Sequence, residues 1–213
     1  MKNLIGMLAL LFLIACAKEE HITTLPIIKE ELCLSELKVG QSSEYLNYLT
    51  YCNDFEGEFR YTGNKLTITL IEKDGKLYAQ EDLYYAILDS TITIEYEVYN
   101  EDKFIVIPDR SLSSLFFFYD NHRIDLEPES RIDLEQNSCQ IFHSDIVFEG
   151  NDIGVLETFQ IGDISKNNLT VVSCEPLVDI EAYLMYNKNE LVASHTIAGL
   201  SLNPEISGWI LQK

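Results

Sequence analysis

The chain has 213 residues, of which 46% are hydrophobic, and its formal net charge at pH 7 is −20. This apolar fraction supports a folded core and excludes an intrinsically disordered acidic protein. The acidic excess argues against nucleic-acid binding, because phosphates are bound by Lys and Arg side chains. It also argues against adsorption to anionic headgroups, so membrane attachment would have to come from a covalent lipid.

The first fifteen residues have the layout of a signal peptide. Lys2 supplies a positive charge, and residues 4–15 form an apolar run of roughly 12 residues. A membrane-spanning helix needs about 20 apolar residues, so this run is too short to span a bilayer. It ends at Leu13-Ile14-Ala15-Cys16, which resembles the lipobox of bacterial lipoproteins. The resemblance implies cleavage after residue 15 and a diacylglycerol on Cys16; the alternative is an ordinary secretory signal.

The residues after Cys16 predict a charged tether. The segment Ala17-Lys18-Glu19-Glu20 is similar to the acidic segments that follow the lipidated cysteine in lipoproteins of the Bacteroidota. This resemblance implies the outer membrane, with surface exposure favoured over the periplasmic face. The alternative is a solvated spacer. We therefore interpret residues 16–31 as the lipidated cysteine and its tether, and the bilayer as a partner through the acyl chains.

From residue 32 onward the pattern is that of short strands and tight turns. No long segment has helical periodicity, and Asp74-Gly75 is typical of a two-residue hairpin turn. Tyr45, Tyr48 and Tyr51, at a spacing of three, fit a helical turn or an irregular loop. The sequence therefore predicts an all-β protein, an antiparallel β-sandwich or two small sandwich-like units. The predicted strands are residues 37–39, 59–62, 65–72, 76–80, 91–99, 104–107, 115–119, 123–126, 131–135, 139–142, 146–148, 169–174, 180–186, 191–195 and 209–211.

A short tandem repeat suggests where two units meet. The sequence Arg-Ile-Asp-Leu-Glu at residues 123–127 recurs at residues 131–135, which predicts two short strands joined by a turn. We place β unit 1 at 32–126 and β unit 2 at 127–213. A weaker similarity supports related units, with chance as the alternative. The two units share a glycine, a cysteine and a tyrosine at the same spacing: Gly40, Cys52 and Tyr61 in the first, and Gly162, Cys174 and Tyr183 in the second.

Four cysteines remain besides Cys16, and in an exported chain they predict disulfides. Four cysteines allow three pairings. We favour the pairing of cysteines that are neighbours in the sequence, Cys33–Cys52 and Cys139–Cys174. No Cys-x-x-Cys motif occurs, which argues against thiol-redox chemistry.

Motifs for metal or cofactor chemistry are not found. The four histidines, His21, His122, His143 and His195, are scattered, and the sequence has no nucleophile elbow and no Gly-rich phosphate loop. We predict no metal and no cofactor. The oxygen-rich segments 100–102 and 149–152 read as polar turns, with calcium binding left open.

Glu95 and Glu97 are the candidate acid pair. On one strand face they lie about 6.5–7 Å apart, within the range of about 5–9.5 Å that glycosidases use. The same face is equally suited to solvent and cross-strand partners. We predict that the protein is not an enzyme. If the alternative, a carboxylate-based hydrolase, were correct, Glu95→Gln should abolish activity.

Five tyrosines are the candidate ligand-binding residues. Tyr45, Tyr48, Tyr51, Tyr84 and Tyr85 could stack on a sugar or form a rigid contact surface, or could fill the edge of the core. The sequence thus predicts a lipid-anchored extracytoplasmic protein that binds a glycan or a protein, or serves as a scaffold, without catalysis. The alternative is a periplasm-facing envelope assembly or inhibitory protein with a basic partner.

Overall fold

The computed structural model describes residues 34–51, 59–115, 123–125, 132–134, 153–177, 180–198 and 205–212. These ranges contain β-strands and one short 3-10 helix, so the all-β prediction is confirmed. The elements are β1 (Ser42–Tyr51), β2 (Arg60–Lys73), β3 (Lys76–Tyr85), β4 (Ser90–Glu97), β5 (Tyr99–Glu101), β6 (Phe104–Val106), the 3-10 helix (Arg110–Leu112), β7 (Arg123–Asp125), β8 (Ile132–Leu134), β9 (Ile153–Ile161), β10 (Ile164–Leu177), β11 (Ile180–Tyr186), β12 (Leu191–Ala198) and β13 (Glu205–Leu211).

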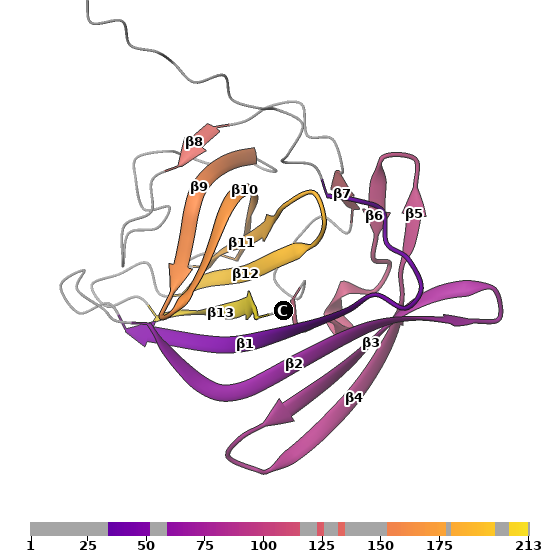
Figure 1. Cartoon of the computed structure of the whole chain (residues 1–213), viewed down its shortest axis with the longest axis horizontal. Coiled ribbons are helices and arrows are strands. Elements are labelled where there is room, and N and C mark those ends of the chain that lie inside the picture. Colours follow the sequence, from indigo (N-terminus) through magenta and orange to yellow (C-terminus); the bar gives the residue numbers. More distant parts are fainter. Residues whose placement is uncertain are drawn as a thin grey trace, which may run out of the picture.

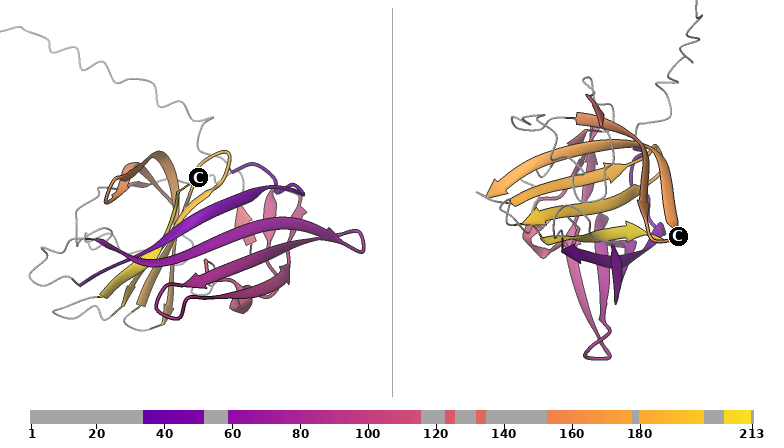
Figure 2. Two further views of the ribbon diagram at one scale, coloured as in Figure 1. Left: turned by 60° about the horizontal axis from the view of Figure 1, so that its bottom comes forward. Right: turned by 90° about the vertical axis from the view of Figure 1, so that its left-hand side faces the viewer.

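Most strands belong to one large sheet in the order β4-β3-β2-β1-β13-β12-β11-β10-β9-β8 (Figure 1). Neighbouring strands are antiparallel except β8 and β9, which are parallel. The pairing of β1 with β13 joins the two ends of the described chain in the middle of the sheet. Strands β5-β6-β7 form a second, small sheet. Figure 2 shows that the large sheet is strongly curved, so that β2–β4 and β9–β12 form two walls.

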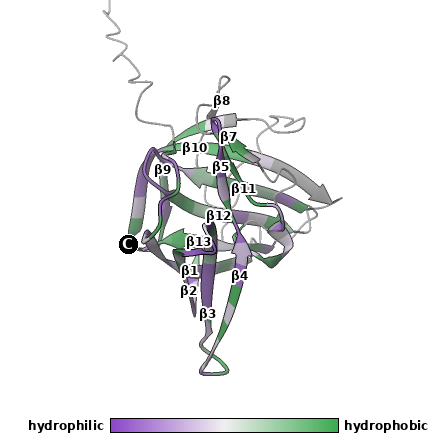
Figure 3. Cartoon of the chain, turned by 90° about the vertical axis from the view of Figure 1, so that its right-hand side faces the viewer, coloured by the Kyte–Doolittle hydropathy of each residue, from purple (hydrophilic) through white to green (hydrophobic). Residues whose placement is uncertain are grey.

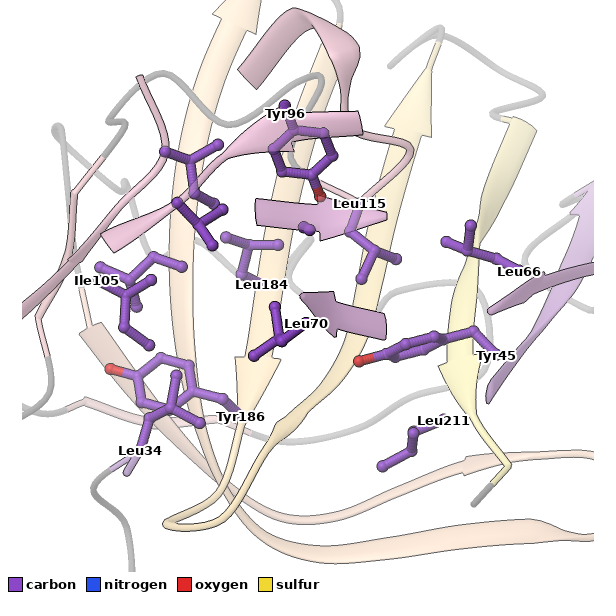
Figure 4. Close-up of a cluster of buried hydrophobic side chains, with 14 of the residues drawn as sticks. Leu34, Tyr45, Leu66, Leu70, Tyr96, Ile105, Leu115, Leu184, Tyr186 and Leu211 are labelled. Carbon is purple, nitrogen blue, oxygen red and sulfur yellow. The ribbon is translucent and has the colours of Figure 1, made fainter. Parts of the chain in front are cut away.

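The first hydrophobic cluster lies between the two sheets. Leu66 and Leu70 come from β2 and Leu184 from β11, while Ile105 and Ile124 come from the small sheet. All five side chains are buried. The small sheet therefore packs on the concave interior of the large one, and the close-up in Figure 4 shows these walls facing each other.

A second cluster occupies the other face of the strands around β13. Tyr48, Phe159 and Met185 are fully buried there. Tyr61 on β2 donates a hydrogen bond of 2.6 Å to the Ile161 carbonyl at the end of β9. Because this contact links distant strands of the same sheet, the sheet wraps around the second cluster. Strands β1 and β10–β13 thus contribute side chains to both clusters.

Several predicted strands are confirmed. Residues 180–186 form β11 as predicted, and Asp74 and Gly75 make the β2–β3 turn with φ of 52° and 74°. Such positive φ values match the twist of the flanking strands. The predicted strands 139–142 and 146–148 lie outside the described residues, as do 116–119.

Three predictions about local structure are wrong, and one strand was missed. Residues 42–51 form β1 and not a helical turn or loop, and residues 37–39 are not a strand. The separate strands predicted at 59–62 and 65–72 are one strand, β2, in which Gly63 has a φ of 89°. Strand β9 was not predicted. Register shifts explain the first of these errors, because β1 carries an irregularity between Leu46 and Tyr48 that breaks the alternation of side chains.

The large sheet contains strands of both predicted units. The repeated segments form β7 and β8, as predicted, but β7 pairs with β6 whereas β8 pairs with β9. Gly40 and Gly162 both have positive φ in turns directly before β1 and β10. The unit boundary at residues 126 and 127 falls outside the described residues and stays a prediction.

Candidate functional site

The β3–β4 hairpin ends in a well-defined turn at residues 86–89. The Leu88 amide donates to the Tyr85 carbonyl at 3.2 Å, and the Ala86 amide donates to Asn64 Oδ1 at 3.0 Å. The Tyr84 hydroxyl donates to Asp89 Oδ1 at 3.0 Å, and Asp89 takes a φ of 45°. These contacts hold the turn in one conformation and leave its apex pointing outward.

The apex of this turn is apolar. Ile87 is 95% exposed and Leu88 is 69% exposed, and Ile92 on β4 is 48% exposed. Figure 3 shows the hairpin projecting from the body of the protein with a hydrophobic tip. We call residues 86–89 the hairpin tip. A contiguous apolar surface on a projecting element is typical of an interaction site, whereas isolated exposed apolar residues are ordinary.

The surroundings of the hairpin tip are acidic. Residues 77–102 contain seven Asp and Glu residues and no Lys or Arg. Asp82 accepts a hydrogen bond of 2.6 Å from Thr93 Oγ1, and Asp89 is held by Tyr84. Lys65 on β2 lies opposite Tyr84 in the sheet. Near the tip itself the acidic side chains are Asp82 and Asp89, with Lys65 as a basic neighbour. Glu81 is buried, and the other acidic residues lie farther from the tip. The tip therefore combines apolar side chains at its apex with two acidic side chains on its flank.

Glu95 and Glu97 lie on the same hairpin, and each is paired with a lysine of the β2–β3 hairpin. Glu95 forms an ion pair with Lys73, and Glu97 accepts two hydrogen bonds of 3.0 Å from Lys76 Nζ. The carboxylate of Glu97 raises the pKa of the Lys76 ammonium group. These contacts are the cross-strand partners that the sequence suggests for a solvent face.

We expect Glu95→Gln to change the free energy of unfolding by less than about 0.5 kcal/mol, because exposed ion pairs contribute little. Urea denaturation of the variant and the wild type measures the difference, with Glu97→Gln as a second exposed pair. A loss above about 1 kcal/mol would show that the Lys73 pair does more than a surface contact.

The structure does not bring the five candidate tyrosines to one surface. Tyr45 is 3% exposed and donates a hydrogen bond of 2.9 Å to the Leu191 carbonyl in the first cluster. Tyr48 is fully buried in the second cluster, and burial raises the pKa of both phenols. Tyr84 and Tyr85 are half-buried at the base of the hairpin tip, and Tyr51 ends β1 with its side chain outside the described part.

His195 lies in the second cluster and is inaccessible to solvent. Its Nδ1 atom is 2.7 Å from the Tyr48 hydroxyl. Its ring centroid lies 5.7 Å from that of Phe159 and 6.3 Å from that of Tyr183. A buried imidazole among aromatic rings is a core residue with a tyrosine partner. His21, His122 and His143 lie outside the described residues.

A glycine makes the Tyr48–His195 contact sterically feasible. Gly208 on β13 lies between the two residues in register, opposite Tyr48 on one side and His195 on the other. A Cβ atom at Gly208 would lie 2.1 Å from the Ser194 carbonyl oxygen and 2.5 Å from the Tyr48 hydroxyl. The ring of Tyr48 thus fills the space that a side chain at this position would need.

A buried carboxylate that the sequence analysis missed lies between the sheets. Glu81 on β3 is inaccessible to solvent; its Oε1 accepts from Tyr96 at 2.7 Å and Ser113 at 2.8 Å, and its Oε2 accepts from the Ser114 amide at 2.9 Å. Burial raises the pKa of the Tyr96 phenol, and the charge of Glu81 adds to this rise. Glu81 therefore fixes residues 113–115 to the sheet. The signal in the sequence is a Glu on the buried face of β3, between Ala79 and Leu83.

The remaining candidate residues are only partly described. Cys16, Cys33, Cys52 and Cys139 lie outside the described residues, and Cys174 lies on β10 opposite Ala182. In the oxygen-rich segment 100–102, both ends of the Asn100 amide bond the backbone of Leu37, at 3.0 and 2.9 Å; segment 149–152 is not described. Within the described ranges, no three His, Cys, Asp or Glu side chains converge as metal ligands.

Comparison with protein-family models, with curated proteins and with solved structures finds no match. Nor does the described part of the chain contain a helix with the length and apolar character needed to span a membrane. The case for a function therefore depends on the chain's own chemistry, and the hairpin tip is its most distinctive surface.

Proposed function

We propose that this chain is a lipid-anchored extracytoplasmic protein of the cell envelope that binds a protein partner through the hairpin tip, without catalysis. The exposure of Ile87 and Leu88 at the apex of a projecting hairpin carries the proposal. Burying two such side chains stabilises a complex by about 1.5–3 kcal/mol each. The partner offers an apolar recess, and basic residues at its rim complement the acidic flank of the hairpin.

The hairpin tip suits a protein better than a glycan or a bilayer. Sugar binding relies on exposed rings and free polar groups, whereas Tyr45 and Tyr48 are buried and the Tyr84 hydroxyl is bonded to Asp89. A bilayer with anionic lipids would repel the negative flank of the tip. An apolar pocket in a basic protein matches both properties of the tip.

The anchor in this proposal is the acylated Cys16, in the outer membrane and preferentially on its outer face. A tether of about 15 residues reaches at most roughly 50 Å, which clears the lipid headgroups. The rival placement is periplasmic, as an envelope assembly or inhibitory protein. Protease treatment of intact cells separates the two: removal of the domain supports the outer face, and protection until the outer membrane is broken supports the inner one.

A photo-reactive amino acid at Ile87 in living cells tests the partner. We expect a discrete protein adduct that disappears when Leu88→Ser is added, and no such adduct from the same group at exposed Lys188 in the β11–β12 turn. The purified partner should bind Leu88→Ser at least about tenfold more weakly, and high salt should weaken wild-type binding. Lipid adducts alone, or adducts equal at both positions, would refute a protein partner at the tip.

A further inference from the structure

An apolar cavity of about 90 Å³ lies within the first hydrophobic cluster, away from the hairpin tip. Its walls come from both sheets: Leu70 and Ala79 on β2 and β3, and Ile105 and Ile124 on the small sheet. Leu34, from the segment before β1, closes one side. In Figure 4 the side chains of Leu34, Leu70 and Ile105 converge on this interior.

The interior of the cavity is unsuited to water. A buried water needs two to four polar partners, and the two phenols that line the cavity donate elsewhere. The Tyr45 hydroxyl donates to the Leu191 carbonyl, and the Tyr96 hydroxyl donates within the Glu81 network. The space therefore favours hydrocarbon, and its volume corresponds to about three molecules of liquid water, or a few methylene groups.

The rim of the cavity is polar and negative. Gln41, Ser43, Asn189 and Glu190 line its edge, and Glu190 is half-buried in the β11–β12 turn, two residues from exposed Lys188. Burial is the main cause of the raised pKa of the Tyr45 phenol, and the negative charge of Glu190 contributes to it. The field of the Glu190 carboxylate therefore reaches the cavity wall.

The segment that closes the cavity is held by a few hydrogen bonds and belongs to no sheet. The side chain of Asn100 bonds both the amide and the carbonyl of Leu37, at 3.0 and 2.9 Å. The Ser35 hydroxyl donates to the Asn189 carbonyl at 3.4 Å. The segment thus runs along the rim from β5 to the β11–β12 turn.

We propose that this cavity binds the end of an unbranched alkyl chain whose head group, neutral or cationic, lies at the rim beside Glu190. Each methylene transferred from water increases the affinity about fourfold, so a chain of several carbons gains affinity from the dry interior. A carboxylate head group would be repelled by Glu190, whereas an ammonium group would be attracted. The ligand class is therefore an alkylamine or alkyl alcohol, not a fatty acid.

The purified mature protein, titrated with hexylamine, 1-hexanol and hexanoate, tests this proposal. Trp209 is the single tryptophan and packs against the first cluster, so its fluorescence reports on the cavity. We expect saturable binding of one molecule per chain, with hexylamine binding about two- to fivefold more tightly than hexanol and hexanoate weakest. Failure of all three to bind saturably would refute the proposal.

Two matched variants locate the site. Ser43→Phe places a ring at the rim and should abolish binding, whereas Ser42→Phe places the same ring at an exposed neighbouring position on β1 and should not. Glu190→Gln should remove the preference for the amine while retaining hexanol. Equal binding by Ser43→Phe and wild type would overturn the site. An unchanged preference for the amine in Glu190→Gln would overturn the role of the charge. The second test does not need Ser43→Phe to fold. Ile87→Ser should not affect this binding, so the result is independent of the hairpin tip.

Discussion

Gly208→Ala is expected to lower the free energy of unfolding by about 3 kcal/mol or more, which is at the upper end for overpacked positions. The added Cβ atom would lie 2.1 Å from a backbone oxygen, that of Ser194, and a backbone atom cannot rotate away as a side chain can. It would also displace the Tyr48 hydroxyl from His195. Urea denaturation followed by circular dichroism measures the loss.

The neighbouring Ser207 supplies the control for Gly208. It lies on the opposite face of β13, half-buried, so Ser207→Ala should change stability by less than about 0.5 kcal/mol. An alanine at Gly208 as stable as the wild type would mean that β12 and β13 can separate without loss. The tight packing of Tyr48 over the glycine would then not be a feature of the protein in solution.

Glu81→Gln is expected to lower the free energy of unfolding by about 2–4 kcal/mol. The carboxylate accepts from Tyr96, Ser113 and the Ser114 amide, and the amide group of glutamine would face one of these donors with its own N–H. Because the network is buried, water cannot replace the missing acceptor. Residues 113–115 should also lose their attachment to β3.

Denaturation together with hydrogen exchange tests the Glu81 network. The Ser114 amide should exchange much faster in Glu81→Gln than in wild type, and Tyr96→Phe should produce a smaller loss of about 1 kcal/mol. Glu95→Gln, an exposed carboxylate on the adjacent strand, is the matched control. If Glu81→Gln and Glu95→Gln had equal effects, Glu81 would not be the anchor of residues 113–115.

Local signals predicted the β2–β3 hairpin turn and several strands correctly. The Asp74-Gly75 turn is specified by its own two residues, because only a few residue types accept positive φ. The apolar stretch at residues 180–186 became β11 with five successive buried residues, Ala182–Tyr186. Such segments need no information from distant parts of the chain.

Strands β1 and β9 escaped prediction for a physical reason. In β1 the pairing shifts between Leu46 and Tyr48, so Tyr45 and Tyr48 enter different clusters although both are buried. In β9, Leu156 and Phe159 are both buried at a spacing of three, which does not fit simple alternation. In β1, burial of side chains in both clusters removes the contrast between polar and apolar positions on which strand prediction depends.

The candidate site was only partly accessible from the sequence. Ile87 and Leu88 look like core residues in a sequence, and only their place at a projecting turn exposes them. The candidate tyrosines show the opposite error: they were predicted to bind a ligand at the surface, but Tyr45 and Tyr48 lie in the core. The roles of Glu190 at the cavity rim and of buried Glu81 also could not be predicted, because they depend on residues that are distant in the sequence.

The pairing of β1 with β13 has a consequence for biosynthesis. The middle of the large sheet forms only when residues 205–211, near the end of the chain, reach residues 45–51 near its beginning. Contacts so distant in sequence form slowly. A nascent chain would thus emerge from the ribosome without its central strand pair. For the exported protein proposed above, the large sheet cannot be completed before residues 205–211 are synthesised, which keeps the precursor unfolded for longer.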